Sequence, residues 1–133
     1  MKPYNCLSCG KENKFKGYSY VNKYCNNKCQ SDHRYNEYIM EWKLGSVNGN
    51  TKYSTSRYIY RYVREQQDGK CKICDINTYN GMPIVLELDH IDGDYTNNTE
   101  KNLRCLCPNC HSQTPTYKNR NVGNGRKYRT KYQ

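Results

Sequence analysis

Closely spaced cysteines are the residues of this chain with the clearest capacity for chemistry. Eight of the nine cysteines form two sets of four, and each set consists of two short pairs. The sets are Cys6, Cys9, Cys25 and Cys29, and Cys71, Cys74, Cys107 and Cys110. Two cysteines separated by two or three residues can reach one tetrahedral ion, and two such pairs complete a four-thiolate zinc site. We therefore predict two structural Zn²⁺ ions, since a redox dithiol would need one pair rather than matched pairs.

Cys105 is left outside both sets. It is either an alternative ligand for the second set or a small buried side chain, which is a common use of cysteine. We expect the buried side chain.

A second group of polar residues lies between and beside the two pairs of the second cysteine set. Asp89 and His90 follow an apolar run, Asn102 comes later, and His111 is next to Cys110. A carboxylate and an imidazole can ligate a divalent cation, and a neutral imidazole can accept a proton near pH 7. Taken singly, each residue has a common structural use, such as a surface acid or a turn asparagine. Their order around two cysteine pairs points to a site.

This order of residues resembles the HNH endonuclease family, whose core is a ββα-metal unit. The resemblance covers about residues 71–121 and includes both pairs of the second cysteine set. Residues 1–44 more loosely resemble a zinc module that accompanies such nucleases in bacteriophage proteins. The resemblance therefore implies a nuclease unit with an accessory zinc module.

The resemblance also implies a role for each polar residue. Asp89 and His111 would ligate a catalytic Mg²⁺ or Mn²⁺, with open positions left for phosphate and water. His90 would be the general base that takes a proton from water. Asn102 would bond to the backbone around the His90 strand, although Asn98 competes with it for this role.

These residues must be positioned by short elements around the zinc sites. We expect a small zinc-stapled α+β fold, namely a treble-clef-like ββα-metal unit with an N-terminal zinc module and connecting helices. Apolar residues at helical spacing predict a helix after Cys29 and another over residues 55–67. An apolar run predicts a strand over residues 84–88, and Pro108 is suited to the first position of a short helix.

The chain divides into four parts by composition. They are a four-cysteine zinc module with a helix (1–44), a linker (45–54), the HNH-like unit (55–121) and a basic C-terminal arm (122–133). Glycine, serine and asparagine mark the linker. The cysteine sets fall in the first and third parts, so each of these is expected to hold its own zinc ion.

Composition limits both the size of the core and the setting of the protein. A chain of 133 residues with a mean hydropathy of -1.20 can bury little aliphatic surface, so bound metal must supply folding free energy. No stretch approaches the ~20 apolar residues that cross a membrane. The N-terminus also lacks the apolar core of a signal peptide. We therefore expect reduced cysteines in a cytoplasm, and the resemblance to bacteriophage nucleases implies that of a phage-infected host cell.

Charge is unevenly distributed along the chain. The formal net charge is +10, which two four-thiolate zinc sites would lower to about +6. Six basic residues near the C-terminus, here called the basic stretch, are Lys118, Arg120, Arg126, Lys127, Arg129 and Lys131. Seven of the twelve acids fall instead between Asp68 and Glu100. Basic charge beside an acidic pocket suits double-stranded DNA held near a cation site, although a solvated tail is the alternative.

Fifteen tyrosines accompany the basic residues. Tyrosine rings can stack on nucleic-acid bases. The codon bias of an A/T-rich genome explains the same abundance equally well. Tyrosine content therefore fits nucleic-acid binding without deciding it.

Together these features predict a divalent-metal-dependent endonuclease that hydrolyses DNA phosphodiester bonds as a monomer, or as a dimer on DNA. A single site per chain favours nicking, and the family resemblance implies 5′-phosphate and 3′-hydroxyl products. The alternative is a non-catalytic zinc protein that binds DNA or RNA. Basic charge fits both, whereas the Asp89-His90 pair favours the enzyme, because a degenerate nuclease would typically have lost one of these residues.

Overall fold

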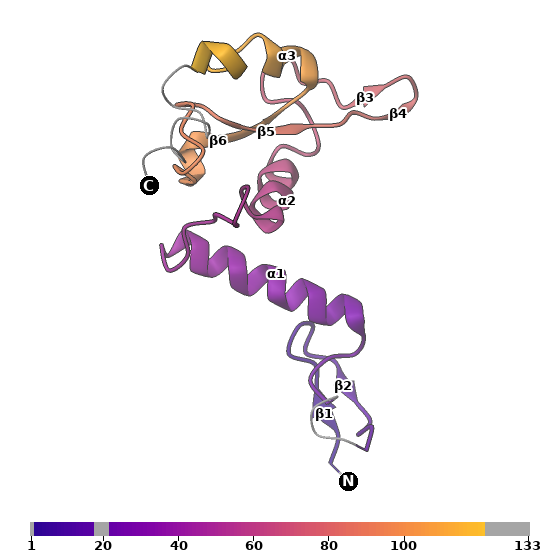
Figure 1. Ribbon diagram of the computed structural model, residues 1–133. Helices are drawn as coiled ribbons and strands as arrows, with labels where there is room; N and C mark the ends of the chain where they lie inside the picture. Colours follow the sequence, from indigo (N-terminus) through magenta and orange to yellow (C-terminus); the bar gives the residue numbers. More distant parts are fainter. Residues whose placement is uncertain (1, 18–21, 122–133) are drawn as a thin grey trace. The chain divides into compact units, whose positions relative to one another are not determined.

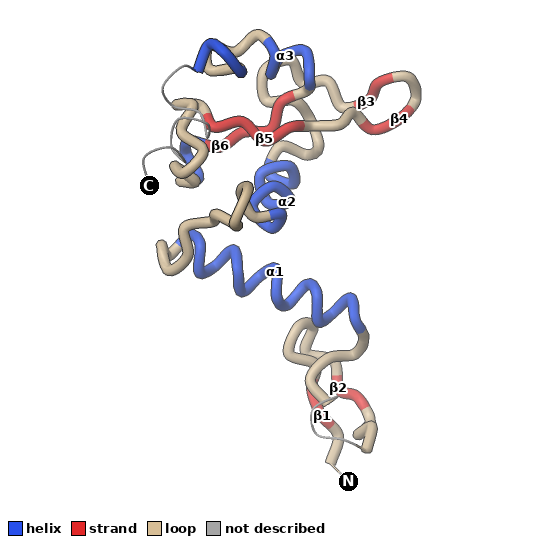
Figure 2. The backbone as a smooth tube through the Cα atoms, viewed as in Figure 1, coloured by secondary structure: helices blue, strands red, loops and turns tan. Residues whose placement is uncertain are grey.

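The computed structural model describes residues 2–17 and 22–121 of the chain. Two compact units make up the chain, Met1–Val47 and Asn48–Gln133 (Figure 1). Both contain short strands, helices and long loops, as Figure 2 shows, so the predicted small α+β fold is confirmed. Residues 48–54 of the predicted linker (45–54) lie in the second unit. The basic residues Arg126, Lys127, Arg129 and Lys131 lie outside the described residues.

The first unit joins a small strand pair to a helix. Strands β1 (Tyr4–Asn5) and β2 (Glu12–Asn13) are antiparallel, and helix α1 (Asn27–Lys43) follows them. The Asn26 side chain caps α1 by accepting a hydrogen bond from the backbone N–H of Cys29 at 2.9 Å. The helix predicted after Cys29 is therefore present. Its buried side chains are Tyr35, Ile39 and Trp42, at helical spacing.

Helix α2 (Arg57–Gln66) opens the regular structure of the second unit. The Ser56 side chain caps its first turn, and Gly69 follows its end with a φ of 68°. A positive φ suits the residue that terminates a helix, so α2 ends where the sequence predicts. Ile59 and Val63 are buried one turn apart on a single face.

Neither α2 nor any other helix in the described part of the chain is long and apolar enough to span a lipid bilayer.

A hairpin absent from the sequence-based prediction follows α2. Strands β3 (Thr78–Tyr79) and β4 (Met82–Pro83) pair around Asn80 and Gly81. Both turn residues have positive φ, 52° and 77°. Positive φ at both central residues is what a type I′ turn requires, and Asn-Gly is its preferred sequence.

The second strand pair carries the polar residues of interest. Strands β5 (Glu87–His90) and β6 (Leu103–Leu106) are antiparallel, and Asp89 lies opposite Arg104. The sequence predicts the first strand over residues 84–88, but the strand begins three residues later. Strand β6 has only four residues, so only the four residues Glu87–His90 find backbone pairing partners in it.

Among the described residues, three short helices follow β5 in the sequence, and one of them, α3 (Pro108–Ser112), contacts both strands of the pair. The 3₁₀ helix η2 (Glu100–Asn102) precedes β6, and helix α3 follows it. Pro108 occupies the start of α3, as predicted from sequence. A second 3₁₀ helix, η3 (Lys118–Asn121), comes last among the described residues.

The core of the second unit forms where α2 packs against β6. Its buried apolar residues are Ile59, Val63, Cys71, Leu86, Leu103, Cys105, Leu106 and Cys107. Gln67, just after α2, ties the helix to the strand through the backbone of Cys105. Its Nε2 donates to the Cys105 carbonyl at 2.9 Å, and its Oε1 accepts from the Cys105 N–H at 2.8 Å. The position of β6 is thus set by both apolar and polar contacts.

We predict that Ile59→Ala lowers the free energy of unfolding of the second unit by about 2–5 kcal/mol, because Ile59 is fully buried. Urea denaturation of the zinc-loaded chain measures this change. Ile73→Ala removes the same atoms from a side chain that is 54% exposed, and should cost less than about 0.5 kcal/mol. Equal losses for the two variants would mean that α2 does not contribute to the core.

Candidate active site and metal centres

The two cysteine sets converge in space as the sequence predicts. Within each set the four sulfur atoms lie within 4.8 Å of one another. The Cys9 and Cys25 sulfurs are 3.6 Å apart, and those of Cys74 and Cys107 are 3.8 Å apart. Zinc–sulfur bonds of about 2.3 Å in a tetrahedral site place sulfurs about 3.8 Å apart. Both sets could therefore hold zinc.

One thiol in each set is already favoured as a thiolate. Burial opposes ionisation of Cys71, but backbone N–H groups of residues 73, 74 and 107 donate to its sulfur and lower its pKa to about 6. Cys6 is affected in the same way, also to a pKa of about 6. Burial and the neighbouring thiols raise the pKa of Cys29 and of Cys110 to about 12. A divalent cation would relieve this repulsion and hold all four sulfurs as thiolates.

Cys105 stays outside both clusters. It is fully buried on β6, and burial raises the pKa of its thiol to about 12. This is the buried role that the sequence predicts. Its side chain contributes to the core rather than to a metal site.

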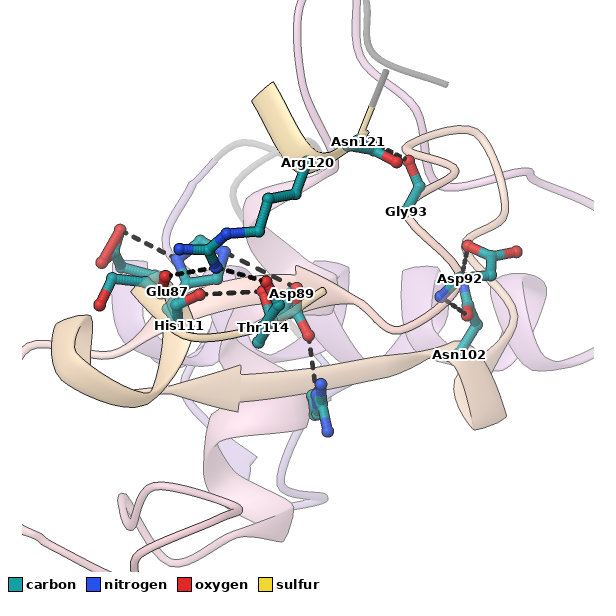
Figure 3. Close-up of polar contacts among 11 residues, drawn as sticks. Glu87, Asp89, Asp92, Gly93, Asn102, His111, Thr114, Arg120 and Asn121 are labelled. Atoms are coloured by element: carbon teal, nitrogen blue, oxygen red, sulfur yellow. Dashed lines mark hydrogen bonds and ion pairs between the residues drawn. The ribbon is translucent and has the colours of Figure 1, made fainter. Parts of the chain in front are cut away.

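Asp89 and His111, the expected ligands of a catalytic ion, lie side by side (Figure 3). Asp89 Oδ1 is 3.6 Å from His111 Nε2, and the Asp89 side chain is 4% exposed. Asp89 Oδ2 accepts a hydrogen bond from Arg104 Nε at 2.7 Å, across the strand pair. Arg104 therefore occupies one carboxylate oxygen and leaves the other facing the imidazole.

The second nitrogen of His111 faces another carboxylate. Nδ1 is buried and has no hydrogen-bond partner among the described residues, but Glu87 Oε2 lies 3.4 Å away. Glu87 precedes Asp89 by two residues on β5, so both side chains point to the same face of the strand. The Tyr117 ring packs edge-on against the imidazole, with ring centroids 5.2 Å apart. Carboxylates behind a ligating histidine commonly set the orientation of its ring.

His90 contacts a different set of residues. Its Nε2 lies 2.7 Å from Asn98 Oδ1 and 3.4 Å from Thr55 Oγ1. His90 lines an open pocket of about 380 Å³ together with polar and aromatic residues and one leucine. These are Ser54, Thr55, Arg57, Tyr60, Leu88 and Tyr95. Thr55 was not identified from sequence, because nothing in a polar loop marks a contact with a residue 35 positions away.

Asn102 and Asn98 have separate partners. Asn102 Oδ1 accepts from the Asp92 backbone N–H at 3.0 Å, and Asn102 Nδ2 donates to Asp92 Oδ1 at 2.9 Å (Figure 3). Asn102 Nδ2 also donates to the carbonyl of Asn97 at 2.8 Å. Asn102 therefore fastens the turn after β5, whereas Asn98 contacts the His90 ring itself.

Two residues of the basic stretch fall within the described part of the chain. Arg120 Nη1 donates to the carbonyls of Ser112 and Thr114, each at 2.8 Å, and so caps the end of α3 (Figure 3). Lys118 is exposed, with its Nζ 5.0 Å from the centre of the Tyr117 ring. Sequence reasoning did not foresee that Arg120 would brace the helix that carries His111.

The fold and these clusters define a small α+β protein with two cysteine tetrads and a carboxylate–imidazole pair whose carboxylate, Asp89, lies on the same strand as a second histidine, His90. Among curated proteins, the chain is similar to the H-N-H endonuclease F-TflIV of Escherichia phage T5. The two are 48% identical over 54 residues, which is 41% of this chain and 24% of that protein. The chain thus spans about a quarter of the length of the relative it matches. The resemblance to HNH endonucleases is confirmed, and it supports a nuclease.

Two further comparisons found no match. No family model matches the chain. No solved structure matches it either. The likeness to the phage endonuclease therefore rests on sequence, and the geometry of the site must be argued from this chain's own residues.

We predict that the purified chain contains two zinc ions and that Cys74→Ser retains only one, because three thiolates hold zinc less tightly than four. Cys105→Ala is the matched control and should keep both ions, since Cys105 lies outside the clusters. Elemental analysis of protein prepared without chelator gives the count. Two ions in Cys74→Ser, or one in Cys105→Ala, would contradict the assignment of ligands.

Proposed function

We propose that this chain is a divalent-metal-dependent endonuclease that hydrolyses phosphodiester bonds in DNA. The observation that carries the proposal is the approach of Asp89 Oδ1 to His111 Nε2 at 3.6 Å, with His90 next to Asp89 on β5. Partial similarity to a phage H-N-H endonuclease supports it. We also propose that the second unit is a treble-clef-like ββα-metal unit around β5, β6 and α3.

The donor atoms of Asp89 and His111 fit a catalytic Mg²⁺ or Mn²⁺. One carboxylate oxygen and one imidazole nitrogen converge, and two protein ligands leave positions for phosphate and water. Arg104 holds the second carboxylate oxygen, so Oδ1 remains directed at His111. When bound, the ion would neutralise charge on the scissile phosphate and the departing 3′ oxygen.

In the proposed reaction His90 accepts a proton from the attacking water. His90 and Asp89 are consecutive residues, with Cα atoms about 3.8 Å apart. Successive residues of a strand point to opposite faces, so we place the phosphodiester group across the end of β5, where His90 is the last residue of the strand. Asn102 holds the backbone just after His90 and so limits movement of the base. The expected products carry 5′-phosphate and 3′-hydroxyl ends, and one site per chain favours a nick.

We propose double-stranded DNA as the partner of the basic stretch. Lys118 is exposed beside the α3 region, and four further basic residues follow Asn121 in the sequence. Such residues contact phosphates without reading sequence. A monomer suffices for nicking, whereas cutting both strands needs a dimer or a second event. Eight thiolates call for a reducing setting, such as the cytoplasm of a phage-infected cell.

We predict that His90→Ala slows the nicking of supercoiled plasmid by about 10²–10⁴-fold in Mg²⁺ or Mn²⁺, because a general base is lost. Zinc content should stay at two ions, and DNA affinity should change little. His33→Ala in the first unit is the matched control, and should cut at the wild-type rate. Gel separation of supercoiled and nicked plasmid over time gives the rates.

Two outcomes would contradict this proposal. Nicking by His90→Ala at the wild-type rate would remove the assigned base. A wild-type chain that binds DNA but does not cut it with either metal would favour a non-catalytic zinc protein.

We predict that truncation after Asn121 weakens DNA binding and flattens its salt dependence. Each lost phosphate contact should change the slope of log affinity against log salt by about 0.9. Cleavage at saturating DNA should change little, since uniform binding affects KM more than kcat. Fluorescence anisotropy at several salt concentrations measures the slope. An unchanged slope would mean that the basic residues beyond Asn121 form a solvated tail.

A further inference from the structure

The Asn98 side-chain amide links His90 to the segment before α2. Asn98 is 4% exposed, and its Nδ2 donates to the carbonyl of Asn48 at 3.1 Å and to Asn50 Oδ1 at 2.7 Å. Its Oδ1 lies 2.7 Å from His90 Nε2. One buried amide therefore joins a proposed general base to two residues about 40 positions earlier in the chain.

The orientation of this amide is fixed by its partner. A backbone carbonyl only accepts hydrogen bonds, so the atom of Asn98 that faces the Asn48 carbonyl must be the NH₂ nitrogen. Reversing the amide would place two carbonyl oxygens 3.1 Å apart without a proton between them. Asn98 Oδ1, an acceptor, is consequently the atom that faces His90.

An acceptor at this distance determines which nitrogen of His90 carries the proton. If Nε2 were unprotonated, two lone pairs would face each other across 2.7 Å. Nε2 must therefore donate to Asn98, and in the neutral ring Nδ1 is then the nitrogen that can accept a proton. Thr55 Oγ1 fits the same arrangement, because its hydroxyl donates to Asn98 Oδ1 at 3.2 Å.

Gly49 allows the amide to lie this close to the preceding segment. Gly49 is buried with a φ of 83°, and a Cβ there would lie 2.3 Å from Ile59 Cδ1 and 3.4 Å from Asn98 Nδ2. A side chain would push this segment away from both neighbours. The contact thus depends on a residue without a side chain, between the two asparagines that accept from Asn98.

We propose that Asn98 is a positioning residue that holds His90 as the Nε2–H tautomer and leaves Nδ1 as the atom that takes a proton from water. Thr55 and the Asn48–Asn50 segment orient Asn98 for this purpose. The proposal rests on the proposed function, in which His90 is the general base. Segment 48–55 therefore contributes to the active site although none of its residues is assigned to contact the metal or water.

The tautomer can be observed directly by long-range ¹H–¹⁵N NMR of the zinc-loaded chain with ¹⁵N-labelled histidine, recorded without added Mg²⁺. At about pH 8.5 histidine is neutral, and the protonated and bare ring nitrogens have distinct shifts. His90→Ala assigns the signals. The wild type should show His90 as the Nε2–H form, and Asn98→Ala should give a mixture of the two forms.

Asn97→Ala is the matched control, because the Asn97 amide bonds to Asp92 rather than to the His90 ring. It should keep the Nε2–H form of His90. In cleavage assays Asn98→Ala should lower kcat by about 10–10²-fold with little change in KM, as expected for a misdirected base. Zinc content and circular dichroism check that each variant is folded.

The outcomes separate this proposal from the proposed function. A wild-type chain that cuts DNA with His90 in the Nδ1–H form overturns the role of Asn98 alone. If Asn97→Ala shows as large a mixture of tautomers as Asn98→Ala, the role of Asn98 is also overturned. General loosening of the turn would then account for the loss of the Nε2–H form in both variants. A wild-type chain that does not cut overturns the base assignment and this inference with it.

Discussion

The convergence of four cysteine sulfurs from two distant parts of the chain is the constraint on which the second unit depends. Cys74 and Cys107 are 33 residues apart in sequence, yet their sulfurs are 3.8 Å apart. A core this small buries too little apolar surface to close such a loop alone. A cation bound by all four sulfurs would supply the missing free energy. Because the unfolded chain has no formed site, the free energy of metal binding would stabilise the folded state directly. Strands β5 and β6 lie within the closed loop, so their pairing benefits directly.

The second cysteine set also positions the candidate active site, because the two share a helix. His111 follows Cys110 on α3, so a contact that fixes the Cys110 sulfur also limits the position of the His111 imidazole. From the opposite side, the strand register brings Arg104 to Asp89, and Asp89 in turn faces His111. Arg120 closes the end of α3. The second cysteine set and the proposed site for a catalytic ion therefore differ in chemistry but share one short helix, α3.

Features that follow local rules could be predicted from sequence. The cysteine sets obey ligand spacing, and α1 and α2 obey helical periodicity. The β3–β4 hairpin was missed although Asn80-Gly81 is a recognised turn signal, because the flanking strands are only two residues long. The shift of β5 could not be foreseen, since strand limits depend on the partner. Contacts of Asn98 with residues 48–50 join polar loops, which carry no periodic signal at all.

The burial of Cys105 has a consequence for how the protein responds to oxidation. An odd cysteine beside a zinc-binding set could form wrong disulfides or compete for the metal. Cys105 is instead enclosed in the core, with its backbone held by Gln67, so oxidants in solution do not reach it. Damage would therefore begin at the more exposed cluster sulfurs, such as Cys74, and appear first as released zinc. The ninth thiol would react only after the second unit had opened.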